Sequence, residues 1–426
     1  MTPEPKPTGL AAELAAELAT ELVDAEAEAR PAPAQLASPL ARFALAVSLV
    51  LVAFNLRPVF SSLAAVLPEV RSATDASPAT ASLLTTLPVL CLGLFAGLAP
   101  RLAHRFGAER VILGLVLLLT AGTALRGFGT VPALLAGSVL AGAAIAVVNV
   151  LLPGLVKRDF PDRVATVTAF YTMALCAGAA AAAGATVPFE RATGAGWQGA
   201  LAAWGVPAFA VALIWAPQAL RPKASERPRA TAGGGSLLRE PLAWQVTGFM
   251  GLQSALAYCI FGWFAPLLRA RGLDAATAGY VVSFSVLMQT AACLLAPGLA
   301  TRGRNQSAFN VAIVALAVVG FLGALFAPIG TVWVWAALQG IGQGSLIAVA
   351  LTVIVLRAPD AATAARLSSM AQGFGYSIAA FGPLATGYLF TSTGEPGATA
   401  PLIVALGAGA ALSGWFAGRD RILPAR

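Results

Sequence analysis

Residues 43–67 read FALAVSLVLVAFNLRPVFSSLAAVL, and this stretch decides the fold class of the chain. At 1.5 Å per residue, a helix of this length spans roughly 37 Å, which is enough to cross a bilayer with some tilt. A single charged residue, Arg57, lies near the middle of the stretch. Because arginine keeps its proton in proteins, placing it at mid-membrane costs about 2.5–3.5 kcal/mol unless something pairs with it. We therefore expect Arg57 to have a function.

The composition of the whole chain is that of a membrane protein with many spans. Hydrophobic residues make up 58% of the 426 residues and charged residues 11%, whereas soluble chains carry about 25% charged residues. Apolar runs of membrane-spanning length recur along the sequence. The net charge of +8 is spread over loops rather than gathered in a basic domain, so we do not expect binding to nucleic acid.

The apolar runs predict an all-α membrane protein with twelve transmembrane helices in two groups of six. The expected spans are 43–67, 79–99, 110–126, 131–155, 164–188, 198–216, 242–267, 276–299, 308–328, 331–355, 366–391 and 401–418. The resulting parts are an acidic arm (1–42, expected to be mostly disordered), an N-terminal bundle (43–216), a linker rich in Pro, Gly and Ser (217–241), a C-terminal bundle (242–418) and a tail (419–426).

The loop charges predict the orientation in the membrane. With both termini placed in the cytoplasm, the inside segments hold most of the 27 Lys and Arg residues, which is the known bias of cytoplasmic loops. One loop motif also recurs in the second half, because LAPRLAHRFG at 98–107 returns as LAPGLATRGR at 295–304. Two parallel six-helix repeats are a plan used by secondary transporters.

The acidic residues strengthen the case for a site at Arg57. All 19 Asp and Glu residues fall in the arm, in loops or at span ends, so we expect no carboxylate to pair with Arg57. A fixed cation without a protein counter-ion suits an anionic substrate; the alternative is that Arg57 bonds to helix-end carbonyls or reaches outward. Pro58 removes the donor for the carbonyl of Phe54 and predicts a kink, where Asn55 can cap the freed region.

Other polar residues inside the spans are further candidates for substrate contact. Lipid would penalise their side chains, so we expect them to face the protein interior. They are Asn149, Tyr171, Gln253, Tyr258, Trp263, Gln343, Gln372 and Tyr376. Gln372 and Tyr376 are four residues apart and share a helix face. For each glutamine a hydrogen bond between helices is the competing interpretation, and Trp263 also fits an anchor at the membrane surface.

The sequence offers little for catalysis or metal binding. The four cysteines lie far apart inside apolar runs, and the single histidine, His104, has no other candidate ligand near it in the sequence. No nucleophile–base pair or phosphate loop is recognisable. We therefore expect neither an enzyme nor a bound cofactor or metal.

Several motifs resemble those of the cyanate/nitroimidazole transporter family of the major facilitator superfamily. They are NLRP at 55–58, LAPRLAHRFG at 98–107, NVLLPGLVKRDFPDR at 149–163, GLQSALAYCIFGWFAP at 251–266 and LSSMAQGFGYSIAAFGP at 367–383. The resemblance implies a twelve-helix inner-membrane permease that works by alternating access on small substrates such as cyanate or 2-nitroimidazole. It carries the motif residues over as Asn55, Arg57, Asn149, Gln253, Tyr258, Trp263, Gln372 and Tyr376. His104 stands where the general superfamily pattern has an acidic residue, so the usual inner-gate charges are not expected in full.

Two functions are compatible with these observations. The first is a secondary transporter of a small organic or inorganic anion, bound near the midplane by Arg57 with help from amide and aromatic groups. The second is an exporter of small neutral or weakly basic heterocycles, such as nitroimidazoles, in which Arg57 is structural. In both cases we expect a monomer in the lipid bilayer of the cell inner membrane, with a small molecule as its substrate.

Overall fold

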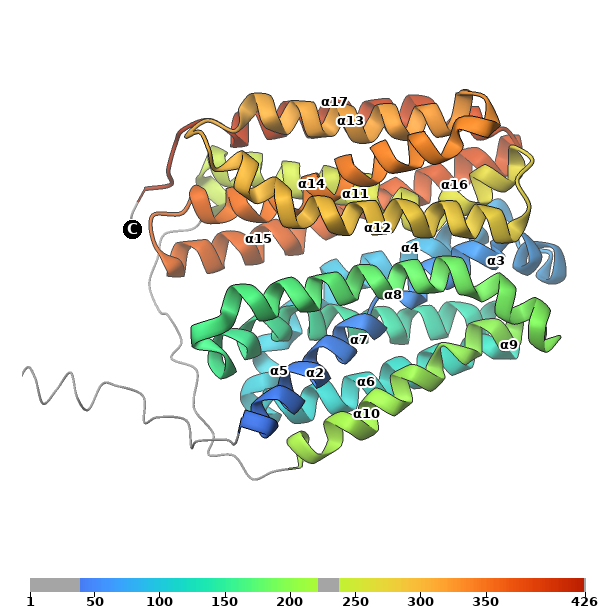
Figure 1. Ribbon diagram of the computed structural model, residues 1–426, viewed down its shortest axis with the longest axis horizontal. Coiled ribbons are helices and arrows are strands. Elements are labelled where there is room, and N and C mark those ends of the chain that lie inside the picture. Colours follow the sequence, from blue (N-terminus) through green and yellow to red (C-terminus); the bar gives the residue numbers. More distant parts are fainter. Residues whose placement is uncertain (1–38, 221–236, 425–426) are drawn as a thin grey trace, which may run out of the picture. The chain divides into compact units, whose positions relative to one another are not determined.

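The structure, a computed structural model, describes residues 39–220 and 237–424 (Figure 1). All regular elements in these residues are helical, as the sequence predicts. From residue 48 onward the described residues form one compact unit, while residues 39–47 provide the first turns of helix α2. Nearly all of the predicted arm and most of the predicted linker lie outside the described residues.

The α-helices form two consecutive series. The N-terminal series comprises α2 (Pro39–Asn55), α3 (Pro58–Thr74), α4 (Pro78–Phe95), α5 (Ala99–Phe106), α6 (Ala108–Leu125), α7 (Val131–Asp159), α8 (Val164–Thr193), α9 (Gly196–Ala203) and α10 (Gly205–Ala219). The C-terminal series comprises α11 (Pro241–Ala270), α12 (Ala275–Ala300), α13 (Ser307–Phe326), α14 (Val332–Leu356), α15 (Ala361–Ala379), α16 (Phe381–Thr393) and α17 (Ala400–Ala417). Short 3₁₀ helices lie between them: η1 (Ala96–Leu98), η2 (Arg126–Phe128), η3 (Pro161–Arg163), η4 (Leu237–Arg239), η5 (Ile329–Thr331) and η6 (Pro396–Thr399).

Eleven helical segments of the described residues are long and apolar enough to cross a membrane. Each of them coincides with a span expected from the sequence. The expected span 366–391 is not among the eleven; it is divided between α15 and α16 at Ala380, and it is rich in the less apolar residues Ser, Gly and Tyr. The count of twelve therefore stays a prediction.

The expected span 43–67 consists of two helices separated by a break. Helix α2 ends at Asn55, and α3 begins at Pro58, which takes the first helical position with Arg57 as its N-cap residue. Proline suits that position because the missing N–H would have had no helical partner. The proline thus ends one helix and starts another, which is a stronger effect than the predicted kink.

The break is packed against helix α8. A Cβ atom added to Gly178 of α8 would collide with the carbonyl oxygen of Phe54, which is the acceptor that Pro58 deprives of its helical donor. Only glycine lets the backbone of α8 approach so closely. Gly178 and Pro58 therefore act together to place Arg57 on the inner side of the bundle.

Helix α11 is the central element of the compact unit. In its most apolar stretch of 18 residues, 89% is buried inside the protein, which is the largest share among the eleven segments. It contacts α3 of the N-terminal series and α12, α14, α15, α16 and α17 of its own series. The two series also meet where α8 packs along α12 and where α4 packs against α15 and α16 (Figure 1).

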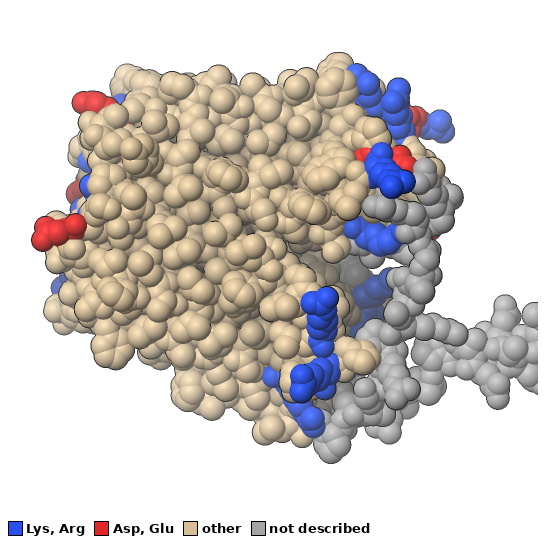
Figure 2. All heavy atoms as spheres, turned by 180° about the vertical axis from the view of Figure 1, so that it is seen from behind, with Lys and Arg blue, Asp and Glu red and all other residues tan. Residues whose placement is uncertain are grey.

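On the face of the molecule seen in Figure 2, the charged surface residues gather at two ends. Figure 2 shows Lys, Arg, Asp and Glu at these ends and a wide uncharged surface between them. Such a band is what the hydrocarbon layer of a bilayer requires. The surface thus agrees with helices that run from one side of a membrane to the other.

Candidate functional site

Arg57 lies at the break between α2 and α3 and reaches toward α11 of the other series. Its Nη1 donates a hydrogen bond of 3.1 Å to the hydroxyl of Tyr258. Its guanidinium carbon lies 5.8–5.9 Å from the ring centroids of Phe60, Tyr258 and Phe261. Each such cation–π contact is worth about 0.5–2 kcal/mol, depending on solvation. Three rings and one hydroxyl therefore hold the guanidinium in place.

The charge of Arg57 has no acidic partner in the described part of the chain. The groups that interact with it electrostatically are Tyr258, Tyr376 and Cys176, all of which are uncharged at neutral pH. The side chain is half-buried rather than fully enclosed. In the described residues, Arg57 is thus a positive charge whose observed partners are all uncharged.

Two other predicted residues join this site. Tyr376 of α15 packs edge-on against Tyr258, with ring centroids 6.3 Å apart. Tyr171 of α8 interacts electrostatically with Tyr376. Both side chains are half-buried. Arg57, Tyr171, Tyr258 and Tyr376 therefore form one cluster, contributed by both series; we call it the Arg57 cluster.

A small pocket adjoins the Arg57 cluster. It shares Phe60, Tyr258 and Phe261 with the surroundings of Arg57, and α4 supplies most of its opposite wall. Its lining residues are Val59, Phe60, Leu63, Leu84, Thr85, Pro88, Tyr258, Phe261 and Gly262. The lining is mainly apolar, with Thr85 and Tyr258 as its polar residues.

Two predicted glutamines lie elsewhere, inside the C-terminal series. Gln343 of α14 donates to the backbone and side-chain oxygens of Gln253 on α11, at 3.2 and 3.3 Å. Both side chains are at most 1% exposed. This hydrogen bond between two buried amides agrees with the competing interpretation, in which the glutamines link helices. The two glutamines bond to each other rather than to Arg57.

The remaining predicted residues have local partners or lie apart from Arg57. Asn55 donates to the carbonyl of Leu51 on its own helix, at 2.9 Å, and so secures the end of α2. Gln372 donates to the hydroxyl of Ser368, one turn earlier on α15. Asn149 is half-buried on α7.

Trp263 is an interior residue. It is 0% exposed, and its indole N–H donates to the hydroxyl of Thr85 on α4, at 3.1 Å. The alternative in which Trp263 anchors the protein at the membrane surface is therefore wrong. The ring also fills the space left by Gly387 of α16, where an added Cβ would collide with it.

Sequence reasoning missed three residues at the site: Phe60, Phe261 and Cys176. Phe60 follows Arg57 by three residues, and Phe261 follows Tyr258 by three, so each shares a helix face with its predicted neighbour. This spacing of three residues could have identified Phe60 and Phe261 from the sequence. Nothing in the sequence relates Cys176 to Arg57, because the two lie on helices that meet only through the fold.

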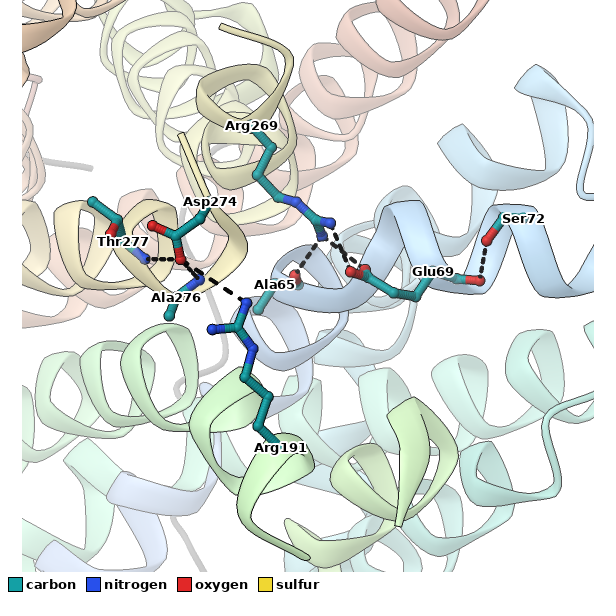
Figure 3. Close-up of polar contacts among 8 residues, drawn as sticks. All are labelled: Ala65, Glu69, Ser72, Arg191, Arg269, Asp274, Ala276 and Thr277. Atoms are coloured by element: carbon teal, nitrogen blue, oxygen red, sulfur yellow. Dashed lines mark hydrogen bonds and ion pairs between the residues drawn. The ribbon is translucent and has the colours of Figure 1, made fainter. Parts of the chain in front are cut away.

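Ion pairs join the two series at the end where α3 meets α11 (Figure 3). Arg269 of α11 holds both carboxylate oxygens of Glu69 on α3, at 2.6 and 2.7 Å, and also donates to the carbonyl of Ala65. Arg191 of α8 lies 4.0 Å from Asp274, the N-cap residue of α12. Hydrogen bonds from Thr277 and from the N–H of Ala276 hold the pKa of Asp274 below its usual value.

A second arginine is buried against the sequence expectation. Arg126, the last residue of the expected span 110–126, is 0% exposed in η2 and donates to the carbonyl of Val59 on α3. The side chain points into the protein because η2 turns the chain back between α6 and α7.

The described residues hold no cluster of three or more His, Cys, Asp or Glu side chains arranged to bind a metal ion. The four cysteines are free thiols, three of them buried.

Residues 43–338 match the family model described as the Major Facilitator Superfamily. An uncharacterised transporter of Bacillus subtilis (strain 168), YycB, is 39% identical over 387 residues, which cover 89% of this chain and 95% of that protein. The 2-nitroimidazole transporter of Escherichia coli (strain K12) is 36% identical, over 89% of this chain and 96% of its own. The cyanate transport protein CynX of the same organism is 30% identical, over 82% and 90%.

Solved structures of transporters share the fold. A bacterial homolog of the human lysosomal transporter Spinster aligns with a TM-score of 0.70 at 17% identity, over 91% of this chain and 100% of that chain. A D-xylose-proton symporter aligns with a TM-score of 0.70 at 13% identity, over 89% and 98%.

Proposed function

Because this chain belongs to the major facilitator superfamily, we propose that it moves a small organic or inorganic anion across the membrane, with Arg57 as the anion-binding residue. The chain is a multi-pass transporter of the inner (plasma) membrane, and its substrate is a small molecule. Its relatives are transporters rather than enzymes. The nature of the substrate and the role of Arg57 are the proposal.

The observation that carries the proposal is the environment of Arg57. Its guanidinium is fixed by three rings and a hydroxyl, yet it is half-buried and has only uncharged partners among the described residues. A protein that needed Arg57 only for stability would be expected to pair it with a carboxylate or with carbonyls. An anion supplies the missing charge while the substrate is bound.

The proposed cycle is alternating access between the two series. The Arg57 cluster draws on α3, α8, α11 and α15, so both series contact one substrate. The ion pairs in Figure 3 join the same two series at one end of the molecule. We propose that this is the outer end, closed in this structure, and that it opens as the series rock about the substrate site.

The topology that goes with this cycle has twelve spans in two six-helix bundles, with α15 and α16 together forming the eleventh. Both termini and the 217–241 linker lie in the cytoplasm, as the loop charges favour, and the transporter works as a monomer. The Arg57 cluster then lies near mid-membrane between the bundles.

A second candidate is export of small neutral or weakly basic heterocycles. The similarity to the 2-nitroimidazole transporter favours it, as do the rings beside Arg57, which can stack on a flat heterocycle. In that case Arg57 stabilises the aromatic arrangement through cation–π contacts.

Transport in proteoliposomes separates the two candidates. Uptake and efflux of radiolabelled small anions, cyanate among them, and of 2-nitroimidazole are measured with wild type, Arg57→Gln and Arg57→Lys. We expect Arg57→Gln to lose anion transport by about 10- to 150-fold, as for loss of a hydrogen bond to a charged group, with partial recovery in Arg57→Lys.

The matched control is Arg304→Gln, which removes an equal charge from an exposed loop. It should transport like wild type. If Arg57→Gln folds and moves anions as fast as the control, the anion proposal fails. If the loss is confined to 2-nitroimidazole, the second candidate replaces it.

A further inference from the structure

Arg126 is the most deeply enclosed cation of the described residues that the transport proposal does not use. Its side chain is 0% exposed, in the turn η2 that follows α6. It lies where α3, α6, α7 and α9 come together, since η2 packs on α7 and α9 and Arg126 bonds to α3. The positive charge of Arg126 therefore lies inside the protein rather than in an exposed loop.

The hydrogen bonding of Arg126 is incomplete. Nη1 donates to the carbonyl of Val59 at 3.1 Å, whereas Nε and Nη2 are buried without a partner among the described residues. Arginine cannot lose its proton to relieve this, as a lysine can. Buried donors of a charged group that stay unpaired are costly, so some acceptor is needed.

The protein offers no anion of its own at this position. No carboxylate in the described part of the chain pairs with Arg126. The carboxyl end of α6, where Arg126 is the C-cap residue, supplies only about half a negative charge. A net positive charge thus remains inside the bundle.

Close packing prevents the side chain from escaping to solvent. Gly137 of α7 lies directly over it, since an added Cβ there would be 2.8 Å from Cγ of Arg126. Trp197 of α9, itself 6% exposed, lies against the Gly129 turn that follows η2. The guanidinium is fixed in the interior.

Two hydroxyl groups on the neighbouring helices are also unpaired. Ser138 follows Gly137 on α7, and Ser62 lies three residues after Val59 on α3; both are at most 1% exposed. Neither hydroxyl has a hydrogen-bond partner among the described residues. Together with the two free nitrogens of Arg126, this region of the bundle holds several donors and one uncompensated charge.

We propose that Arg126 binds a small inorganic anion of the halide class, held by its Nε and Nη2 donors. A single negative charge balances the guanidinium, and a compact anion accepts hydrogen bonds from several directions. The site belongs to the N-terminal series alone, so it ties α3, α6 and α7 together and is distinct from the Arg57 cluster. It does not depend on the proposed substrate.

Thermal unfolding of the purified full-length protein tests this site. Melting temperatures are measured in sodium chloride and in sodium gluconate at equal ionic strength, for wild type, Arg126→Met, Arg57→Gln and Arg304→Gln. We expect chloride to raise the melting temperature of all except Arg126→Met, by about 1–2 °C for each tenfold excess of chloride over its Kd.

The proposal is overturned if wild type melts equally in both salts, or if Arg126→Met keeps the chloride response. A loss of response in Arg57→Gln alone would place the halide at the transport site instead. Should Arg126→Met fail to fold, bromide anomalous scattering from wild-type crystals decides: a peak at hydrogen-bond distance from Nε or Nη2 supports the site, and its absence there rejects it.

Discussion

Arg57 is held in a fixed position by one hydroxyl and three aromatic rings. The Tyr258 hydroxyl accepts a hydrogen bond from Arg57, so the phenol proton points away from Arg57. The ring of Tyr258 also contacts Phe60, at 5.5 Å between centroids, and Tyr376, at 6.3 Å. In the proposed site, we expect this phenol both to hold the cation and to donate to the bound anion.

Replacing Tyr258 with Phe tests this double role. The variant keeps the ring contacts and removes only the hydroxyl, so we expect anion binding to weaken by about 2- to 12-fold, the value of one ordinary hydrogen bond. Equilibrium binding to detergent-solubilised protein measures it. Tyr388→Phe, which removes a hydroxyl from an exposed tyrosine of α16, is the control; equal losses in the two variants would remove Tyr258 from the site.

At the residue scale, the sequence indicates that Arg57 is a candidate site residue, because a charged side chain inside an apolar span is costly unless something pairs with it. It could not separate the polar residues that face a cavity from those that bond within a bundle. Gln253 and Tyr258 lie on the same helix and both carry polar groups, yet one meets Gln343 and the other Arg57. The difference depends on which helix packs opposite.

Proline and glycine together shape the elements around the site. Pro58 frees the carbonyl of Phe54, and Gly178 lets α8 lie directly over it. The close approach is possible because Gly178 has no Cβ. It also brings α8, which carries Cys176 and Tyr171, to the Arg57 cluster.

We expect Gly178→Ala to destabilise the protein by about 1–3 kcal/mol, because the new methyl group collides with backbone rather than with a flexible side chain. Transport should fall as α8 moves away from Arg57. Thermal unfolding and transport assays measure the two effects. Gly154→Ala on α7 is the matched control, since an added Cβ there meets nothing within 4 Å; it should be neutral or stabilising. If both variants behave alike, the close approach of α8 has no role.

At the element scale, the apolar runs predicted the helices to within a few residues, but not the breaks inside them. Helices α9 and α10 part at Trp204, and α15 and α16 part at Ala380. Pro207 and Pro383 explain both, since each lacks the N–H that would bond to the carbonyl four residues earlier, at Ala203 and Ala379. Yet Pro153, Pro188 and Pro266 lie inside unbroken helices. Neighbouring helices decide which proline breaks its helix, and a single sequence does not contain that information.

At the scale of the whole molecule, contacts between the two series join them at one end. Glu69 and Arg269 form a two-pronged pair, and Trp263 bonds to Thr85 deeper inside. The side chains of Arg269 and Glu69 are 20% and 31% exposed, so water weakens the pair, and it contributes about 1 kcal/mol rather than several. A contact of that strength can bias a conformational equilibrium without locking it.

We expect Glu69→Gln to raise the population of the form that is open at this end by about 5-fold, since 1 kcal/mol corresponds to that factor. A cysteine introduced at Leu84, in the wall of the pocket beside Arg57, reports it through its rate of labelling by a membrane-impermeant maleimide in a background without native cysteines. The exchanged pair Glu69→Arg with Arg269→Glu should restore slow labelling. Labelling that stays slow in Glu69→Gln would show that the ion pair does not hold the end closed.

The pairing of Glu69 with Arg269 also marks the limit of sequence reasoning at this scale. Both residues read as ordinary charges at the ends of spans, on helices about 200 positions apart. Arg126 had the same appearance and is fully buried. Composition and loop charge predict the class and the orientation, whereas contacts between helices distant in the sequence follow only from how those helices pack.

The most direct test of the central claim is equilibrium binding of a small anion, such as radiolabelled cyanate, to the purified transporter. Binding separates the role of Arg57 from every later step of transport. We predict that Arg57→Gln weakens binding by about 10- to 150-fold, while Arg304→Gln binds like wild type, and that the affinity stays constant from about pH 6 to 9 because a guanidinium does not titrate there. Equal anion affinity in wild type and in a folded Arg57→Gln would contradict the account.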